Sequence, residues 1–329
     1  MNKIGITIGD VNGIGIEVLI KSFKELKSIL KQNRLIVFGE KVHLEFYFKE
    51  QEMKNNLQFT DMFTEFSPTL NKPSGRFEIF PLKFRKSYLP EPGRISKISG
   101  ELAHRSIITA CSEVKNKNLD SIVTLPISKE SIRAGGCRQT GHTTILEDYF
   151  KKKITMVFLS EEMNVILITI HLPISKVPSK ISKEEIIQKI ETVYHFFKKR
   201  KRNQKFLILG LNPHAGENSL LGKEEESIII PAVKTLITKG IKISGPVSPD
   251  AAFSKKNRDN FDFFVAMYHD QGLIPFKMLA LFKSCQVSTG LDFIRTSVSH
   301  GTGFDIAGKG IAYPDSFIYA VKKNIELLQ

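Results

Sequence analysis

The sequence predicts an α/β protein whose sheet is largely parallel. Short runs rich in Val, Ile, Leu and Phe alternate along the chain with longer amphipathic stretches, and turn residues separate them. The 329 residues suffice for two domains that each bury a core, and hence for a cleft between them. No internal repeat or low-complexity tract interrupts the alternation.

Six β-rich runs are expected to be strands. They are residues 3–8, 35–38, 121–124, 165–170, 206–211 and 261–267. An amphipathic helix is expected at 16–30, after the first strand. Residues 67–100 are rich in Pro, Gly, Ser and aromatic side chains, which predicts a loop-and-hairpin excursion.

A further helix is expected after residue 182. Ser182 and Glu185 have the spacing of a capping box, and apolar residues follow at helical intervals. These are Ile186, Ile190, Val193 and Phe197. The basic run at 198–202 would end this helix, where cations oppose the helix dipole.

Composition excludes several classes of protein. With 41% hydrophobic and 25% charged residues the chain is typical of folded rather than disordered proteins. Its longest apolar runs are shorter than the roughly 20 residues that cross a membrane, and the N-terminus lacks a secretory signal pattern. Cys111, Cys137 and Cys285 form no C-x-x-C pair, which indicates a reducing compartment. We therefore expect a cytoplasmic protein that does not span a membrane.

The formal net charge is +14, which would suit a polyanionic partner such as a nucleic acid. The excess is mostly lysine in short runs, and the densest run falls at the expected helix end. Because no DNA-reading or single-strand-binding module accompanies it, a solvated surface is favoured over nucleic-acid binding.

Polar residues collect directly after the expected strands. Three of the eight histidines, His171, His214 and His269, occupy such positions. In an open parallel sheet the ligand crevice lies outside the carboxyl ends of the strands. Neutral imidazoles suit one divalent ion, but spacings of tens of residues leave three unrelated loop histidines as the alternative. Asp270, beside His269, could be a hydrogen-bond acceptor, a base or a turn residue.

Two glycine-rich segments follow other strands, and neither matches G-x-G-x-x-G or a P-loop. GDVNGIGIE at 9–17 could bind an anion at a helix N-terminus or simply form a tight turn. HGTGFDIAGKG at 300–310 follows Arg295 and could wrap a phosphate or a nucleotide.

His142 could act as an acid or base or hydrogen-bond a phosphate. Lys277 could bind an anion or move a proton, or merely extend to solvent.

Seven segments together resemble the 4-hydroxythreonine-4-phosphate dehydrogenase family of vitamin B6 biosynthesis, over residues 3–313. They are GDVNGIGIE at 9–17, VTLPISK at 123–129, GHT at 141–143, HLPISKVP at 171–178, LNPHAGENSLLGKEE at 211–225, MYHDQGLIPFK at 267–277 and GLDFIRTSVSHGTGFDIAGKG at 290–310. The resemblance implies NAD(P)+-dependent oxidation of the C3 hydroxyl of 4-phosphooxy-L-threonine. The 2-amino-3-oxo acid then loses CO2 and becomes 3-amino-2-oxopropyl phosphate. A paralogue acting on a phosphothreonate or phosphoerythronate is the alternative.

The resemblance also implies partners and residue roles. It implies a divalent metal (zinc, magnesium or cobalt) held by His171, His214 and His269, with the third histidine from the neighbouring subunit of a homodimer. Substrate contacts carry over to His142, Thr143, Lys277, Gln286 and Arg295. Asp250, Asp270 and Lys277 would orient groups or handle protons. His300, Gly301 and Asp305 would bind the cofactor, NAD or NADP.

The fold implied is that of isocitrate and isopropylmalate dehydrogenases, with two α/β/α domains and a cleft. Residues 1–124 plus 271–329 would form a discontinuous domain with the cofactor loop, and 125–270 a second domain with the metal ligands and the dimer interface. The chain departs from the family pattern at GDVNGIGIE, where GDPAGIGPE is common. Ser128 stands where histidine or asparagine is common. Gln286 stands where asparagine is usual, and Ser299 where aspartate is usual.

Overall fold

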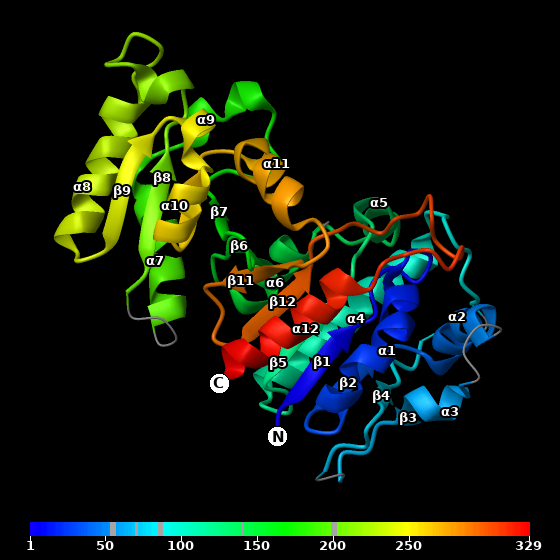
Figure 1. Cartoon of the computed structure of the whole chain (residues 1–329). Coiled ribbons are helices and arrows are strands. Elements are labelled where there is room, and N and C mark those ends of the chain that lie inside the picture. The colour runs from blue at the N-terminus through cyan, green and yellow to red at the C-terminus, as the bar shows by residue number, and fades with distance from the viewer. Residues whose placement is uncertain (53–56, 70–71, 85–87, 140, 199–202) are drawn as a thin grey trace. The chain divides into compact units, whose positions relative to one another are not determined.

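The computed structural model describes residues 1–52, 57–69, 72–84, 88–139, 141–198 and 203–329. The chain divides into two compact units. Unit 1 is Met1–Lys153 with Leu291–Gln329, and unit 2 is Ile154–Gly290 (Figure 1). Each unit has a sheet covered by helices, which confirms the α/β class. None of the described helices is both long and apolar enough to cross a membrane.

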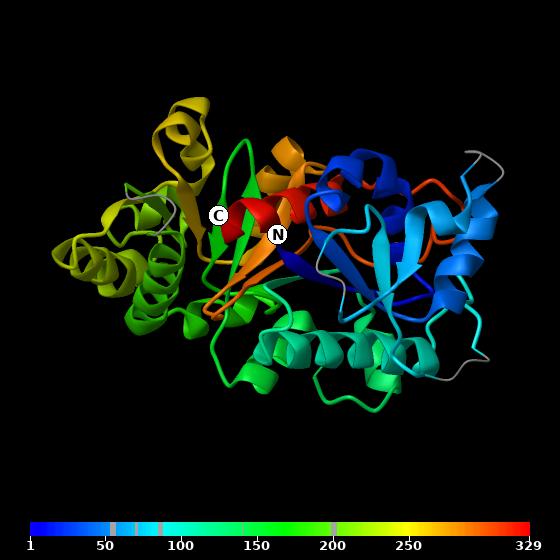
Figure 2. The same cartoon turned by 90° about the horizontal axis from the view of Figure 1, so that it is seen from below.

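Unit 1 has a parallel sheet of six strands. In spatial order they are β3 (Phe63–Glu65), β4 (Phe77–Phe80), β2 (Arg34–Phe38), β1 (Lys3–Thr7), β5 (Ser121–Thr124) and β12 (Ile294–Val298). Figure 2 shows α1 (Gly15–Leu30) and α12 (Asp315–Leu328) on one face and α4 (Lys97–Lys115) on the other. The remaining helices are α2 (Lys41–Glu52), α3 (Phe59–Met62), α5 (Lys129–Ala134) and α6 (His142–Phe150).

The hairpin predicted within 67–100 is wrong. β4 pairs in parallel with both β2 and β3, and parallel neighbours cannot be joined by a tight hairpin turn. Arg34 on β2 also reaches Glu78 on β4, with 2.9 Å between Nε and Oε1, and both side chains are buried. Residues 70–71 and 85–87 of this stretch lie outside the described residues.

Unit 2 has a mixed sheet. Its spatial order is β11 (Ser284–Thr289), β6 (Thr155–Ser160), β7 (Val165–Leu167), β10 (Phe263–Ala266), β8 (Lys205–Leu209) and β9 (Lys242–Val247). β6 is antiparallel to β11 and β7, and the other pairs are parallel. The helices are α7 (Lys183–Lys198), α8 (Ile230–Thr238), α9 (Pro249–Ala252), α10 (Lys255–Asn260) and α11 (His269–Ala280). Short turns η1 (Ile174–Lys176), η2 (Pro178–Lys180) and η3 (Pro213–Gly216) and a π-helical turn η4 (Glu225–Ile229) complete it.

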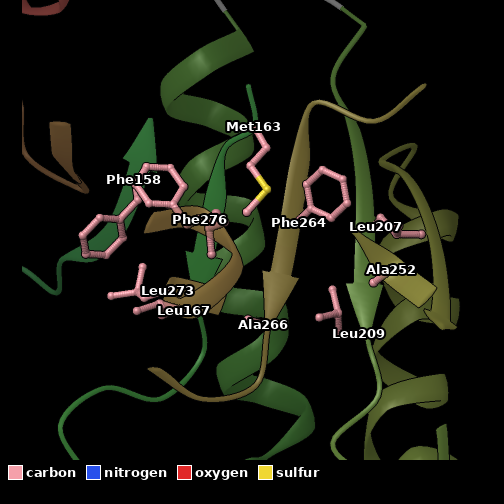
Figure 3. Close-up of a cluster of buried hydrophobic side chains, with 11 residues drawn as sticks. Phe158, Met163, Leu167, Leu207, Leu209, Ala252, Phe264, Ala266, Leu273 and Phe276 are labelled. Atoms are coloured by element: carbon pink, nitrogen blue, oxygen red, sulfur yellow. The ribbon is translucent and has the colours of Figure 1, made fainter. Parts of the chain in front are cut away.

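Helices cover both faces of the unit 2 sheet because its strands are apolar on both sides. Phe263 contacts Phe197 of α7, whereas its neighbour Phe264 stacks on Phe253. Successive side chains of a strand point to opposite faces, so these contacts identify two cores. Figure 3 shows the second core, in which Leu273 and Phe276 of α11 lie close to strand residues such as Leu167.

The helix predicted after residue 182 is confirmed as α7. Ser182 Oγ accepts a hydrogen bond from the Glu185 amide at 3.1 Å. The four apolar residues predicted to line one face of the helix are all buried. Lys198 ends α7, and 199–202, the rest of the basic run, lie outside the described residues.

The unit boundaries fall at 153/154 and 290/291, not at the predicted 124/125 and 270/271. α5 and α6 belong to unit 1 because they pack on α4. Gly100 allows the approach of α4 to α5, since a Cβ there would lie 1.9 Å from the Ser131 carbonyl oxygen. β11 belongs to unit 2 because it pairs with β6, and α11 packs on β7 and β10 of the same unit.

Candidate active-site residues

His171 and His269 follow neighbouring parallel strands. β7 ends at Leu167 and β10 at Ala266, and these two residues are register partners. The two imidazole rings lie 5.6 Å apart, centroid to centroid. An ion about 2 Å from each ring nitrogen would lie about 3 Å from each centroid, so two rings that share an ion can be up to about 6 Å apart. The pair therefore fits two ligands of one divalent ion.

Asp270 fixes the orientation of the His269 ring. Its Oδ1 lies 2.7 Å from His269 Nδ1, a contact that favours the tautomer with the proton on Nδ1, which donates to the carboxylate oxygen. The lone pair of Nε2 is then directed away from Asp270, and such a carboxylate–imidazole pair is typical of metal-bound histidines. This contact favours the acceptor role among the three alternatives for Asp270.

His214 lies in an unusual loop after β8. His214, Ala215 and Glu217 have φ between 42° and 50°, and His171 has φ 47°. Non-glycine residues seldom adopt this left-handed region, and such conformations concentrate at functional sites. Both histidines are exposed. Asp250 is exposed as well, and its pKa is lowered by a hydrogen bond from Ser248 and, to a smaller extent, by His214.

The described part of the chain contains no group of three or more His, Cys, Asp or Glu residues arranged to hold a metal ion. His171 and His269 approach each other, and the remaining predicted ligand, His214, does not join them within one chain. One chain therefore offers two of the three predicted metal ligands at one place.

Sequence reasoning missed Glu225, which supports the His214 loop. Its buried carboxylate accepts the amides of Leu211 and Asn212 at 2.7 and 2.8 Å. The Asn212 side chain donates to the same carboxylate at 2.9 Å. Glu225 begins the π-helical turn, a rare element that often occurs at functional sites. Glu225 lies in an acidic run after Gly222 and Lys223, and no pattern in that run predicts that its side chain supports the loop.

In unit 1, the partly buried His142 lies within the electrostatic influence of the buried Arg295. Arg295 is 0% exposed, and its Nη2 donates to Thr124 Oγ1 at 2.5 Å. Burial, and then the charge of Arg295, hold the pKa of His142 well below its usual value. His142 is therefore neutral at pH 7. Its Nε2 is buried without a hydrogen-bond partner among the described residues, so it is available to a ligand.

The neighbouring thiol is chemically inert. Burial raises the pKa of Cys111 to about 12, although the charge of Arg295 acts in the opposite direction. A thiol of this pKa is neither a nucleophile nor a metal ligand at neutral pH.

The two glycine-rich segments of unit 1 are joined by backbone contacts. The Ile14 amide donates to the Thr302 carbonyl at 2.8 Å, and a Cβ on Gly13 would lie 2.7 Å from the same oxygen. The amides of Asp10 and Gly13 are also used inside the protein. This internal use of the amides favours the tight turn over the anion site for residues 9–17.

Asn12 connects this turn to a third segment. Its Oδ1 accepts from Tyr88 Oη at 3.1 Å and from the Glu91 amide at 2.9 Å, and its Nδ2 donates to the Arg94 carbonyl at 2.9 Å. The side chain is completely buried. Asn12 stands where alanine is common in the family pattern, and only the contacts in the structure reveal its role.

The remaining predicted residues divide between the units. Within 300–310, Gly301 and Asp305 are exposed, and a Cβ on Gly301 would meet no atom within 4 Å. Burial lowers the pKa of His300, whose Nε2 has no partner among the described residues. Thr143 lies beside His142 at the start of α6, Lys277 is exposed on α11, and Gln286 is buried on β11.

The departures at Ser128 and Ser299 have structural roles. Ser128 caps α5, its Oγ accepting from the Ser131 amide at 3.1 Å. Ser299 Oγ lies 3.1 Å from Ser316 Oγ, a side-chain contact that joins the start of the 300–310 loop to α12.

The fold and the polar strand ends define a class of α/β proteins with a candidate ligand site at the strand ends. The chain is similar in fold to isocitrate dehydrogenase from Methylococcus capsulatus, with a TM-score of 0.50 and 15% identity over 99% of this chain and 85% of the other. It is more similar to a 4-hydroxythreonine-4-phosphate dehydrogenase from Burkholderia phymatum. That structure has a TM-score of 0.81 and 35% identity, over 99% of this chain and 98% of the other.

Sequence relatives agree with the structural ones. A 4-hydroxythreonine-4-phosphate dehydrogenase from Sulfurihydrogenibium sp. is 40% identical over 99% of this chain and 98% of the relative. A D-threonate 4-phosphate dehydrogenase from Cupriavidus necator is 36% identical over 98% and 96%. The family profile described as pyridoxal phosphate biosynthetic protein PdxA matches residues 31–324. The chain belongs to this family.

Proposed function

We propose that the protein is an NAD(P)-dependent dehydrogenase of 4-phosphooxy-L-threonine in vitamin B6 biosynthesis. A hydride passes from C3 of the substrate to the nicotinamide, and the C3 hydroxyl loses its proton. The resulting 2-amino-3-oxo-4-(phosphooxy)butanoate releases its carboxylate as CO2 and yields 3-amino-2-oxopropyl phosphate. The observation that carries the proposal is the approach of His171 to His269. It occurs in a chain that is 40% identical to a relative named 4-hydroxythreonine-4-phosphate dehydrogenase.

We propose that His171, His214 and His269 hold one divalent ion, either zinc, magnesium or cobalt. A bound ion would supply Lewis-acid polarisation of the substrate oxygen without redox work. Asp270 sets the tautomer of His269 through the Nδ1 contact. Asp250, whose pKa is lowered chiefly by the hydrogen bond from Ser248, is with Lys277 and Asp270 our candidate for proton handling.

Substrate anions would bind to cations of the chain. Arg295 carries a buried guanidinium, which suits a phosphate or carboxylate because it presents several donors in a fixed plane. Neutral His142 can hydrogen-bond the substrate through Nε2 without adding charge beside Arg295. Lys277, Thr143 and Gln286 complete the proposed set of substrate contacts.

We propose that the segment 300–310 binds the nucleotide cofactor. Gly301 leaves open space above its backbone, and His300 offers the buried Nε2. Asp305 is exposed in the same segment, where a carboxylate can accept hydrogen bonds from ribose hydroxyls.

We propose a homodimer whose second copy completes the metal site. Large apolar side chains are exposed near the histidines in sequence, with Leu220 80% and Met278 82% exposed. Leu172, Ile174 and Ile274 are also exposed, at 39%, 71% and 59%. A second copy would cover these side chains and supply the ligand that one chain lacks.

We place the enzyme in the cytoplasm because its three cysteines are free thiols.

A substrate assay separates the two candidate activities. Purified, metal-loaded protein would be offered 4-phosphooxy-L-threonine and, separately, D-threonate 4-phosphate, the substrate named for a relative that is 36% identical. NADH or NADPH formation with the first is expected. Turnover of the second alone would reject the proposed substrate and favour the phosphothreonate alternative.

A further inference from the structure

The side chain of Gln271 joins the segments that carry two of the candidate ligands. Its Oε1 accepts from the Met267 amide at 2.7 Å, two residues before His269. Its Nε2 donates to the Gly210 carbonyl at 2.8 Å, four residues before His214. Gln271 is 8% exposed, so water cannot easily replace either bond.

This amide continues a pairing that the backbone has ended. The register of β8 with β10 stops at Ile208 and Val265. Beyond that point the Met267 amide and the Gly210 carbonyl both bond to Gln271. Among side chains of this length only an amide offers an acceptor and a donor together.

Thr169 makes the corresponding connection on the other side of β10. Its amide and its Oγ1 both donate to the Met267 carbonyl, at 3.1 and 2.7 Å. The backbone of Met267 is thus held by Thr169, which follows β7, through its carbonyl and by Gln271, which also contacts the segment after β8, through its amide. Figure 3 shows the core residues Leu167, Leu209 and Ala266 at the ends of these three strands.

We propose that Gln271 is a positioning residue that holds the backbone before His269 and before His214, so that each histidine keeps its place for metal binding in the homodimer. This inference rests on the proposed metal site. Metal–ligand distances tolerate only about 0.2 Å, so a small shift of either segment would weaken binding. Loss of an outer support of this kind typically costs about 10- to 100-fold in metal affinity.

Titration of the full-length protein with Co²⁺ tests the proposal, by calorimetry and by visible absorption. Gln271→Glu keeps the acceptor for Met267 but places an acceptor against the Gly210 carbonyl. The matched control is Gln204→Glu. Gln204 is also buried in unit 2, and its Nε2 donates to the Tyr194 carbonyl at 2.9 Å, before β8 begins and away from the histidines.

We expect Gln271→Glu to bind Co²⁺ at least about 10-fold more weakly and with an altered absorption band. Gln204→Glu should bind within about twofold of the wild type, with a similar loss of thermal stability. If Gln271→Glu does not fold, the Co²⁺ titration is made with Gln271→Met instead. This substitution removes both hydrogen bonds while preserving the length of the side chain.

Two contrary outcomes are distinguishable. If the wild type binds Co²⁺ and His214→Ala does not, but the Gln271 variants bind as tightly as the wild type, the positioning role is overturned and the metal site stands. If the wild type itself shows no saturable Co²⁺ binding, the metal site is overturned and the positioning role with it.

Discussion

Three candidate polar groups of unit 1 are buried, whereas two candidate metal ligands of unit 2 are exposed. Arg295 and the Nε2 atoms of His142 and His300 are inaccessible to solvent. His171 and His214, in contrast, lie open on loops with left-handed backbone. A buried cation beside a neutral imidazole would form the anion site that we propose in unit 1. The exposed histidines of unit 2 need a further group to become a closed metal site, which agrees with the homodimer that we propose.

The largest effect should come from unit 2. Replacing a ligand must cost more than the roughly 100-fold lost with an outer support, so His214→Ala should reduce kcat by more than about 100-fold and abolish bound metal. Metal content and turnover would be measured on the purified protein. His195→Ala, an exposed histidine of α7, is the control. Full metal content and activity in His214→Ala would reject the assignment.

A smaller effect is expected from unit 1. Arg295→Lys retains the charge but loses the planar donors, and a hydrogen bond to a charged group contributes about 1.5–3 kcal/mol. The KM for the phosphorylated substrate should rise about 10-fold or more, while the KM for NAD should change little. Steady-state kinetics with each substrate varied in turn would show this. The reverse pattern would move Arg295 to the cofactor.

The buried loops of unit 1 should also lose stability when their cross-link is removed. Asn12→Ala leaves Tyr88 Oη and the Glu91 amide without their acceptor, which should lower the free energy of unfolding by about 1–3 kcal/mol. Urea titration would measure this loss. Asn118→Ala removes an exposed contact with Glu113 and should change stability by less than about 0.5 kcal/mol. Equal effects would mean that burial of Asn12 contributes nothing.

The smallest effect is a pH dependence. The pKa of His142 is lowered from 6.5, so the unfolded chain binds its proton first as the pH falls below 6.5. The stability that neutral His142 contributes is present above pH 6.5 and is lost on acidification, by up to about 1.4 kcal/mol per pH unit. His142→Gln should therefore show a shallower loss between pH 6.5 and 5 in urea titrations. An unchanged slope would place the pKa of His142 near its usual value.

Local patterns predicted six strands and two helices, but not α6, α11, β11 and β12, which carry several of the candidate site residues. The expected strands at 121–124 and 206–211 correspond to β5 and β8, and the expected helix at 16–30 to α1. The strand predictions extended too far at 165–170, because β7 ends at Leu167 and the chain then turns towards His171. Apolar periodicity continues into that turn, so composition alone does not mark the end of the strand.

The supports of the site were not predictable in the same way. Gln271 bonds to a residue 61 positions away, and Asn12 to one 76 positions away. Glu225 accepts from amides 13 and 14 positions earlier, across a loop with left-handed residues. No pattern within one element indicates such partners, because each contact depends on which segments the fold brings together.

The sequence by itself determined the class of fold, the family resemblance and the identity of the residues that carry the chemistry. These follow from propensities and motifs that act over a few neighbouring residues. Only the tertiary structure decided that Arg295 is buried and His214 exposed, that α5, α6 and β11 lie beyond the expected boundaries, and that Gln271 joins two strand ends. Burial and long-range hydrogen bonds depend on packing between distant segments, which local interactions do not specify.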